Sequence, residues 1–195
     1  MKKIVIATTN IGKLKEIKEI LPEFNIVSLS DMNINIDVVE DGETFISNAV
    51  KKATEICNIS NEITLADDSG LEIDFLDKKP GVYSARYLGE DTSYSIKNAH
   101  ILSLLPQDIN QRTARFVCAV CVAFPKENGA VETITAQETF EGVIAYEPKG
   151  KNGFGYDPIF YVPEYNMTSA EMPPELKNKL SHRGKAIRKI RSYLI

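Results

Sequence analysis

The order of predicted elements in the first 32 residues constrains the fold more than any other feature of the chain. An apolar run over residues 3–8 has the length of a buried strand, and a polar turn follows it. Apolar residues at positions 11, 14, 17, 20 and 21 then have helical spacing, and Pro22 ends that helix. A second strand is predicted over residues 25–32. This strand–loop–helix–strand order is typical of α/β proteins.

The rest of the chain predicts a mixed sheet, because long strands follow one another there without a helix between them. Five further segments have strand composition: residues 63–66, 71–75, 114–124, 131–140 and 143–146. Three further segments have helical periodicity: residues 44–57, 93–105 and 184–194. Residues 148–166 are rich in glycine, proline and aromatic residues, which predicts a structured loop with little regular structure.

Length and composition indicate one soluble domain. A chain of 195 residues fits a single domain over residues 1–195, or one domain with two lobes. Its 23 Lys and Arg against 27 Asp and Glu give a net charge of −4, which does not favour a nucleic-acid-binding surface. No apolar run approaches the roughly 20 residues of a membrane helix, and the apolar part of MKKIVIATTN is too short for a signal peptide. We therefore expect neither a nucleic-acid nor a membrane partner.

Three cysteines without regular spacing argue against a disulfide framework and predict a cytoplasmic protein. Cys118 and Cys121 form a C-x-x-C pair within the strand-like run RFVCAVCVAF. We interpret this pair as buried strand residues, because free cysteine packs as a small apolar side chain.

The segment LADDSGLEI, residues 65–73, places two carboxylates after an apolar run. Asp67, Asp68 and the earlier Glu40 offer the hard oxygen ligands that Mg²⁺ prefers when it also binds substrate phosphates. The alternative is a DDSG turn in which the Asp side chains cap backbone amides. The residues alone do not distinguish the two.

The segment TTNIGK, Thr8 to Lys13, lies where the first strand gives way to the first helix. Free N–H groups at a helix start attract anions such as phosphate, and Lys13 would add a positive charge. The segment lacks the Walker A pattern. The alternative is an ordinary N-cap by Asn10 beside a surface lysine.

Glycines flank Phe154 in the segment KGKNGFGYDPIF, residues 149–160, and would let the backbone approach a ligand. Phe154 could then stack on a nucleobase. The alternative is a glycine-rich hairpin loop with aromatic residues in the core.

Lys177, His182 and Arg183 lie close together in the sequence before the last predicted helix. Lysine and arginine neutralise phosphate, while arginine and histidine can donate to a carbonyl. The alternative is a solvated charged face. Together with the three preceding segments, this cluster supplies the residue types that a nucleoside triphosphate site with Mg²⁺ requires.

Six segments in order resemble the signature blocks of the inosine triphosphate pyrophosphatase family, also called Ham1-like or non-standard purine NTP pyrophosphatases. They are TTNIGK, EDGETFISNAVKKA, ADDSGLEI, PGVYSARY, GFGYDPIF and SHRGKA. The resemblance implies an elongated α/β fold with two lobes, a long central mixed sheet flanked by helices and an active-site cleft between the lobes. It also implies a homodimer that hydrolyses ITP, dITP and XTP to the monophosphate and pyrophosphate with Mg²⁺, which removes deaminated purines from the nucleotide pool.

The resemblance also implies roles for individual residues. Asp68 would be the catalytic proton acceptor, and Glu40 and Asp68 would bind the metal. The implied substrate-binding residues are Thr8, Thr9, Asn10, Lys13, Ser69, Phe154, Gly155, Tyr156, Asp157, Lys177, His182 and Arg183. Two alternatives to this function stay open: a related pyrophosphatase that acts on modified pyrimidine nucleotides, and a nucleotide-binding regulator without turnover.

Overall fold

A computed structural model describes residues 1–36 and 38–195. A seven-stranded sheet in the order β2-β1-β3-β4-β5-β6-β7 organises the chain. Its strands are β1 (Lys3–Ile6), β2 (Asn25–Ser28), β3 (Thr64–Ile73), β4 (Thr113–Pro125), β5 (Val131–Ile144), β6 (Phe160–Val162) and β7 (Met167–Thr168). Strand β1 pairs in parallel with β2 and β3, whereas β6 pairs antiparallel with β5 and β7. The predicted α/β fold with a mixed sheet flanked by helices is therefore confirmed.

The chain divides into two compact units, each built from separate stretches of sequence. Unit 1 contains residues 1–68, 118–138 and 182–195. Unit 2 contains residues 69–117 and 139–181. Strands β3, β4 and β5 each contribute residues to both units. The elongated outline and the cleft between lobes stay predictions.

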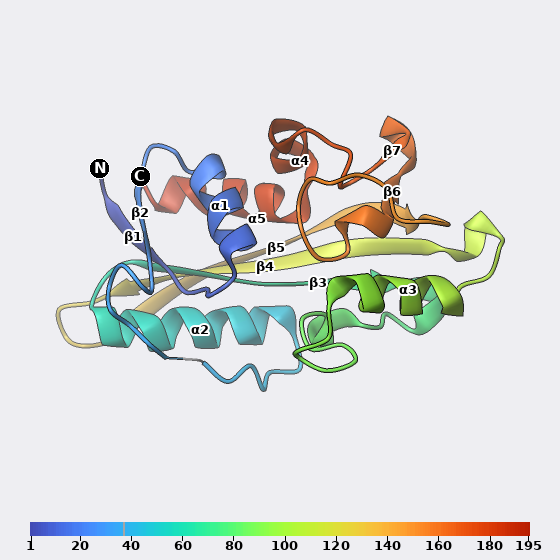
Figure 1. Cartoon of the computed structure of the whole chain (residues 1–195). Helices are drawn as coiled ribbons and strands as arrows, with labels where there is room; N and C mark the ends of the chain where they lie inside the picture. Colours follow the sequence, from blue (N-terminus) through green and yellow to red (C-terminus); the bar gives the residue numbers. More distant parts are fainter. Residues whose placement is uncertain (37) are drawn as a thin grey trace. The chain divides into compact units, whose positions relative to one another are not determined.

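Helices cover both faces of the sheet in unit 1. Helices α1 (Ile11–Ile20) and α5 (His182–Ile190) lie on one face, and α2 (Phe45–Ser60) lies on the other (Figure 1). The core on the α1 and α5 side contains Ile17 of α1, Ile187 of α5 and Cys118 of β4. Cys118 and Cys121 are buried free thiols in β4, as predicted. Both termini of the chain belong to this unit.

Side-chain caps explain where the helices of unit 1 begin. The Asn10 side chain accepts a hydrogen bond from the Lys13 N–H at 3.1 Å and so starts α1. Thr44 and Ser47 form a capping box that starts α2, and Asn61 in the left-handed conformation ends it.

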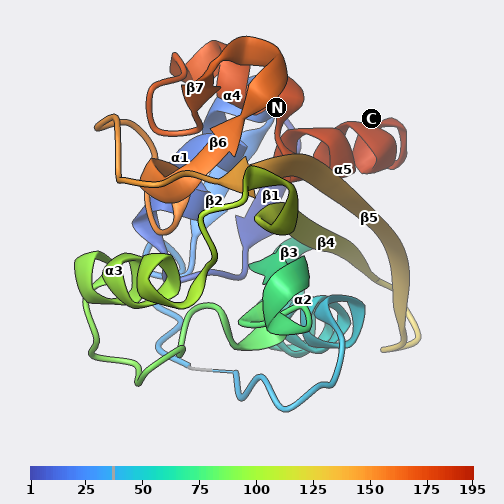
Figure 2. The same cartoon turned by 90° about the vertical axis from the view of Figure 1, so that its right-hand side faces the viewer.

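Unit 2 packs α3 (Tyr94–Leu104) and the short helix α4 (Pro174–Leu180) with its own strand segments (Figure 2). Its core joins Ile101 of α3 to Phe116 of β4 and Phe160 of β6. The Phe116 and Phe160 rings lie 4.4 Å apart between centroids. Phe160 also contacts the Phe140 ring of β5, so aromatic packing fixes these strands together.

Several element boundaries differ from those predicted from the sequence. Residues 63–66 and 71–75 do not form two strands around a DDSG turn, because β3 runs unbroken through Asp67 and Asp68. Likewise β5 is one strand over Val131–Ile144. The loop over residues 148–166 contains the short strand β6, and α4 was not anticipated. Helix α5 also begins at His182, ahead of the predicted start at residue 184.

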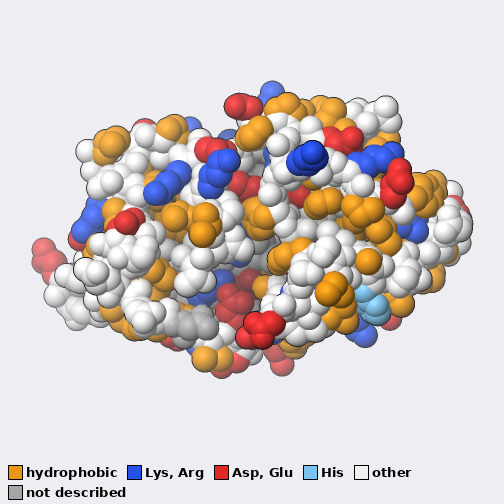
Figure 3. Space-filling model, in the orientation of Figure 1, with side chains coloured by type: hydrophobic (Ala, Val, Ile, Leu, Met, Phe, Trp, Pro, Cys, Tyr) orange, Lys and Arg blue, Asp and Glu red, His pale blue; other side chains and the backbone are white. Residues whose placement is uncertain are grey.

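On the face shown in Figure 3, Lys and Arg side chains are interspersed with Asp and Glu side chains. Among residues 1–36 and 38–195, no helix combines the length and apolar character needed to cross a membrane.

Candidate active site

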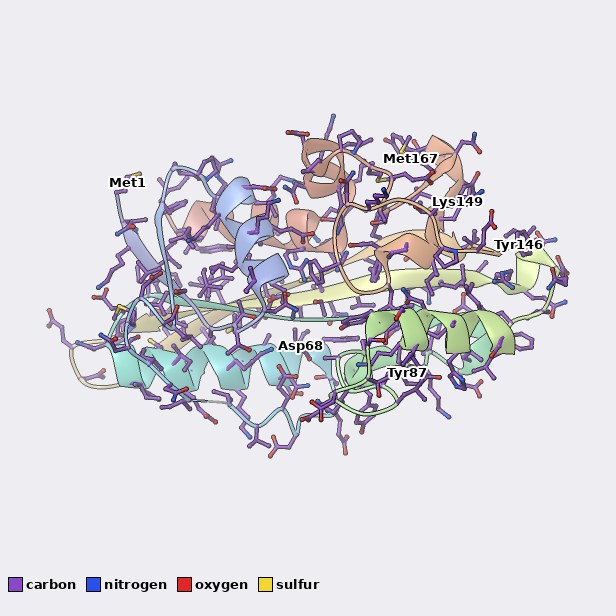
Figure 4. The ribbon with its side chains drawn as sticks, viewed as in Figure 1. Met1, Asp68, Tyr87, Tyr146, Lys149 and Met167 are labelled. Carbon is purple, nitrogen blue, oxygen red and sulfur yellow. The ribbon has the colours of Figure 1, made fainter. Side chains whose placement is uncertain are left out.

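Asp68 is a buried carboxylate held against the N-terminal half of α2 (Figure 4). Its side chain is supplied by β3, and the residue is 4% exposed. One carboxylate oxygen accepts a hydrogen bond from Asn48 Nδ2 at 3.0 Å, and the other lies 4.0 Å from Lys52 Nζ. The carboxylate therefore has a fixed orientation, which a group that transfers a proton requires.

Lys52 lies between three acidic residues of unit 1, namely Glu40, Asp67 and Asp68. Its ammonium pairs with Glu40 and donates to the backbone carbonyl of Asp67 at 2.8 Å. Burial alone would lower the pKa of Lys52, but the charges of Asp68, Asp67 and Glu40 raise it above its ordinary value. Lys52 therefore stays a cation between Glu40 and Asp68.

Burial also sets the protonation of Asp68. Removal from water raises the pKa of this carboxyl above its ordinary value, although the positive charges of Lys52 and Lys13 oppose the rise. A raised pKa makes a carboxylate a better proton acceptor near neutral pH than an ordinary Asp. The environment of Asp68 thus suits general-base chemistry.

Glu40 and Asp68 form a donor set that fits Mg²⁺. Both are carboxylates, and both already face one cation, the Lys52 ammonium. No group of three His, Cys, Asp or Glu side chains that could hold a metal occurs in the described residues. Mg²⁺ is commonly bound by only one or two carboxylates, with substrate phosphates and water completing the shell. Two carboxylates therefore suffice.

Asp67 belongs to a different cluster from Asp68, because neighbouring residues of a strand point to opposite faces. Its carboxylate lies 3.2 Å from Lys13 Nζ and accepts hydrogen bonds from Arg183 at 3.0 and 3.2 Å. Arg183 also pairs with Glu16 of α1. Burial alone would raise the pKa of Asp67, but Lys13 and Arg183 hold it well below its usual range.

The partners of Asp67 explain why the predicted turn is absent. Sequence reasoning left Asp67 as either an acidic neighbour of Asp68 or a turn former, and the unbroken strand excludes the turn former. An Asp pair is unfavourable in a strand by local propensity. Here each Asp has its own cationic partner, so tertiary ion pairs outweigh that local preference.

The start of α1 combines a cap with a cation. Asn10 caps the helix, as the plainer interpretation of TTNIGK holds, and its own N–H donates to Thr8 Oγ at 3.2 Å. Thr9 is exposed, and the Lys13 side chain is 14% exposed. Lys13 is thus no freely solvated surface lysine, and the two interpretations of the segment are compatible.

Unit 2 holds its own polar cluster around Asp157. This buried carboxylate accepts hydrogen bonds from Phe154 N at 2.7 Å, Ser169 Oγ at 2.7 Å and Lys177 Nζ at 2.5 Å. A built Cβ at Gly153 would collide with the carboxylate of Asp157, and Gly153 has a positive φ of 72°. Glycine is therefore required there for the loop to close over Asp157.

The same cluster places Phe154 beside a cation. Lys177 Nζ lies 5.2 Å from the centroid of the Phe154 ring. The Phe154 residue itself is only partly buried, whereas Tyr156 is buried and packs edge-on against Tyr94 at 5.2 Å. Of the two aromatic residues, Phe154 is the more exposed, and Tyr156 belongs to the core.

The structure assembles the predicted site residues in two groups. Unit 1 brings together six of them with measured geometry, namely Thr8, Asn10, Lys13, Glu40, Asp68 and Arg183. Unit 2 brings together Phe154, Gly155, Tyr156, Asp157 and Lys177. His182 is buried at the start of α5, and Ser69 follows Asp68 along β3.

Sequence reasoning missed Asn48, Lys52 and Glu16. All three are buried polar residues on helices. Asn48 and Lys52 lie at helical spacing on the stripe that also buries Phe45, Ala49 and Ala53. A polar pair on an otherwise apolar helix face was the signal that could have found the first two.

Comparisons with known proteins find relatives over nearly the whole chain. The sequence profile described as the Ham1 family matches residues 4–193. A protein of Desulforamulus reducens named dITP/XTP pyrophosphatase is 50% identical over 192 residues, which cover 96% of this chain and 92% of that protein. One of Bacillus subtilis with the same name is 45% identical and covers 100% of this chain and 98% of its own. The solved structure of the Staphylococcus aureus Ham1 protein has a TM-score of 0.85 at 40% identity, covering 99% of this chain and 98% of that one.

Proposed function

This chain belongs to the Ham1 family, and on that premise we propose that it hydrolyses dITP, XTP and ITP to the monophosphate and pyrophosphate. Relatives that carry the name dITP/XTP pyrophosphatase span nearly its whole length. The observation that carries the proposal is Asp68, a buried and oriented carboxylate whose pKa is raised. A protein that only binds nucleotides does not need such a proton acceptor.

In the proposed reaction, Asp68 removes a proton from a water molecule that attacks the α-phosphorus. The water oxygen forms a bond to that phosphorus, and the bond from the α-phosphorus to the bridging oxygen breaks. Pyrophosphate leaves with that oxygen, and the proton resides on Asp68. Asn48 fixes the orientation of the carboxylate, and Lys52 places a positive charge beside it.

Glu40 and Asp68 are the residues proposed to hold Mg²⁺. A bound Mg²⁺ ion supplies neutralisation of phosphate charge. The α1 N-terminus, with Thr8, Thr9, Asn10 and Lys13, is proposed to bind the triphosphate.

The remaining predicted residues are proposed to bind the nucleoside. Phe154 would stack on the purine ring, and Asp157 and Lys177 would hold the loop that carries it. Ser69, His182 and Arg183 stay predicted substrate contacts, with the latter two as donors to O6. Hypoxanthine and xanthine offer an O6 acceptor, whereas adenine offers an amino group there, so a donating site would reject ATP.

We expect the protein to prefer ITP, dITP and XTP over ATP and GTP. The measurement is kcat/KM for each nucleotide with Mg²⁺, with pyrophosphate and phosphate assayed separately. Equal rates on ATP and ITP would leave only a general pyrophosphatase, and phosphate as the product would contradict the cleavage site. Turnover confined to modified pyrimidine nucleotides would favour the related house-cleaning activity, and binding without turnover would favour the regulator.

Lys13→Ala is expected to weaken triphosphate binding, because it removes a positive charge from the start of α1. The ratio of ITP to ATP activity should change little, since Lys13 is assigned to the phosphates. The measurement is KM for both nucleotides. Lys15→Ala on the same helix, where the side chain is 72% exposed, is the matched control and should behave as the wild type. A KM for ITP that is the same in both variants would remove Lys13 from the triphosphate site.

We also propose that the protein is a cytoplasmic homodimer. Among the described residues, Cys57, Cys118 and Cys121 are free and buried, which fits a reducing compartment. The dimer follows from the family resemblance, and the molar mass in solution tests it against the 21.7 kDa of one chain.

A further inference from the structure

One face of α3 carries polar residues where an apolar stripe would be expected. Tyr94, Lys97, Asn98 and Ile101 share this face at helical spacing, and the last three are buried. Lys97 Nζ donates to the Ala85 carbonyl at 2.6 Å, and Asn98 Nδ2 donates to the Gly155 carbonyl at 3.2 Å. Adjacent residues of α3 therefore hold two segments of unit 2 that lie far apart in the sequence.

The segment around Ala85 is held from several sides. Tyr156 OH donates to the Ser84 carbonyl at 2.8 Å, and the Tyr87 ring lies 5.9 Å from the His100 ring of α3. Loss of one contact there would leave others in place. The bond from Asn98 to Gly155 differs from that of Lys97 because it holds the loop that carries Phe154.

Asn98 is 5% exposed, and its amide orientation is fixed by the carbonyl that it contacts. A flipped amide would place its oxygen against the oxygen of Gly155. In the fixed orientation Oδ1 is buried and has no hydrogen-bond partner in the described part of the chain. An unsatisfied buried acceptor is destabilising. An apolar residue would remove this unsatisfied acceptor but would also lose the bond to Gly155.

The Gly155 carbonyl lies one residue after Phe154 in the chain. On one side of it, the Phe154 N–H is bound to Asp157 at 2.7 Å, and Gly155 itself has a positive φ of 69°. Tyr94 lies 3.5 Å from the position of a Cβ built on Gly155. Asp157 thus fixes the nitrogen of Phe154, and Asn98 fixes the carbonyl one residue later.

We propose that Asn98 is a positioning residue that sets the orientation of the Phe154 ring for stacking on the nucleobase. The inference rests on the proposed function, since it assigns Phe154 to the base. Asn98 itself touches the loop and not the substrate.

The first test uses Asn98→Leu, an apolar side chain of similar size that removes both the donor and the unsatisfied acceptor. Its melting temperature is expected to stay close to that of the wild type, because removal of the unsatisfied acceptor offsets loss of the bond to Gly155. KM for ITP is expected to rise about 2- to 10-fold with kcat little changed, which corresponds to the loss of one hydrogen bond. Inhibition by inorganic tripolyphosphate should not change, because that ligand has no base. Asn110→Ala, which removes an exposed amide in the same unit, is the matched control.

The second test needs no substrate. Hydrogen exchange of peptides that cover residues 151–158 should be faster in Asn98→Leu, whereas peptides from α2 should exchange as in the wild type. Asn98→Ala serves the same measurements if the leucine variant does not fold. An unchanged exchange rate in the loop would overturn the inference, as would an unchanged KM for ITP. A tripolyphosphate inhibition constant that shifts as much as KM would indicate a general structural role and overturn it too. Absence of ITP hydrolysis by the wild type would instead contradict the proposed function.

Discussion

Asp68→Asn is expected to lower the turnover of ITP by at least ~10²-fold, the usual scale for loss of a general base. The substitution keeps the size of the side chain but removes its charge and its ability to accept a proton. The measurement is kcat with saturating ITP and Mg²⁺. Asp77→Asn is the matched control, because Asp77 is exposed and its left-handed φ of 51° suits asparagine. Near wild-type turnover in a folded Asp68→Asn protein would remove Asp68 from catalysis.

The stability of the same variant shows whether it is folded. The pKa of Asp68 is raised in the native state, so its protonated form is favoured by folding. That contribution is present at low pH and is lost as the pH rises through the native pKa. At neutral pH the native state therefore bears the cost of a buried charge, and Asp68→Asn should not lower the melting temperature.

The raised pKa also predicts how Asp68 titrates. In the metal-free wild type, the Asp68 carboxyl should titrate at a higher pH than an ordinary Asp, because burial raises its pKa; NMR of the side chain measures this. Asp67 stays ionised over that range, because Lys13 and Arg183 hold its pKa low. Titration of Asp68 at the position of an ordinary Asp would contradict the raised pKa.

Arg183→Ala is expected to lower the free energy of unfolding by about 3–5 kcal/mol, the scale for breaking a buried ion pair. Arg183 is 2% exposed, and its removal leaves Asp67 and Glu16 with less positive charge in the interior. The chain contains no tryptophan, so urea unfolding is followed by circular dichroism. Arg191→Ala removes an exposed pair with Glu23 and should cost no more than about 1 kcal/mol.

The same variant separates the structural role of Arg183 from its predicted contact with the base. Unfolding reduces the rates on ITP and ATP by the same factor, so their ratio is unaffected. If Arg183 contacts O6, its removal should lower the ratio of the ITP rate to the ATP rate, mainly by loss of ITP activity. A stability equal to that of the Arg191→Ala control would contradict the ion-pair role.

The sequence by itself determined the fold class and most helices and strands. The helical spacing before Pro22 predicted α1, and the apolar run around Cys118 predicted β4. These signals depend on neighbours within one or two turns of helix or one strand, so the local sequence contains them. Six ordered segments also indicated the family, which the match over residues 4–193 bears out.

Only the tertiary structure decided the roles of the charged residues. Asp67 and Arg183 are 116 positions apart, and no local pattern pairs them. Their ion pair, together with that of Asp68 and Lys52, allows a strand to pass through two aspartates for which the sequence also allowed a turn. The low pKa of Asp67 and the raised pKa of Asp68 likewise arise from burial and from charges on distant segments. Electrostatic energy depends on distance in space and on exclusion of water, and folding alone fixes both.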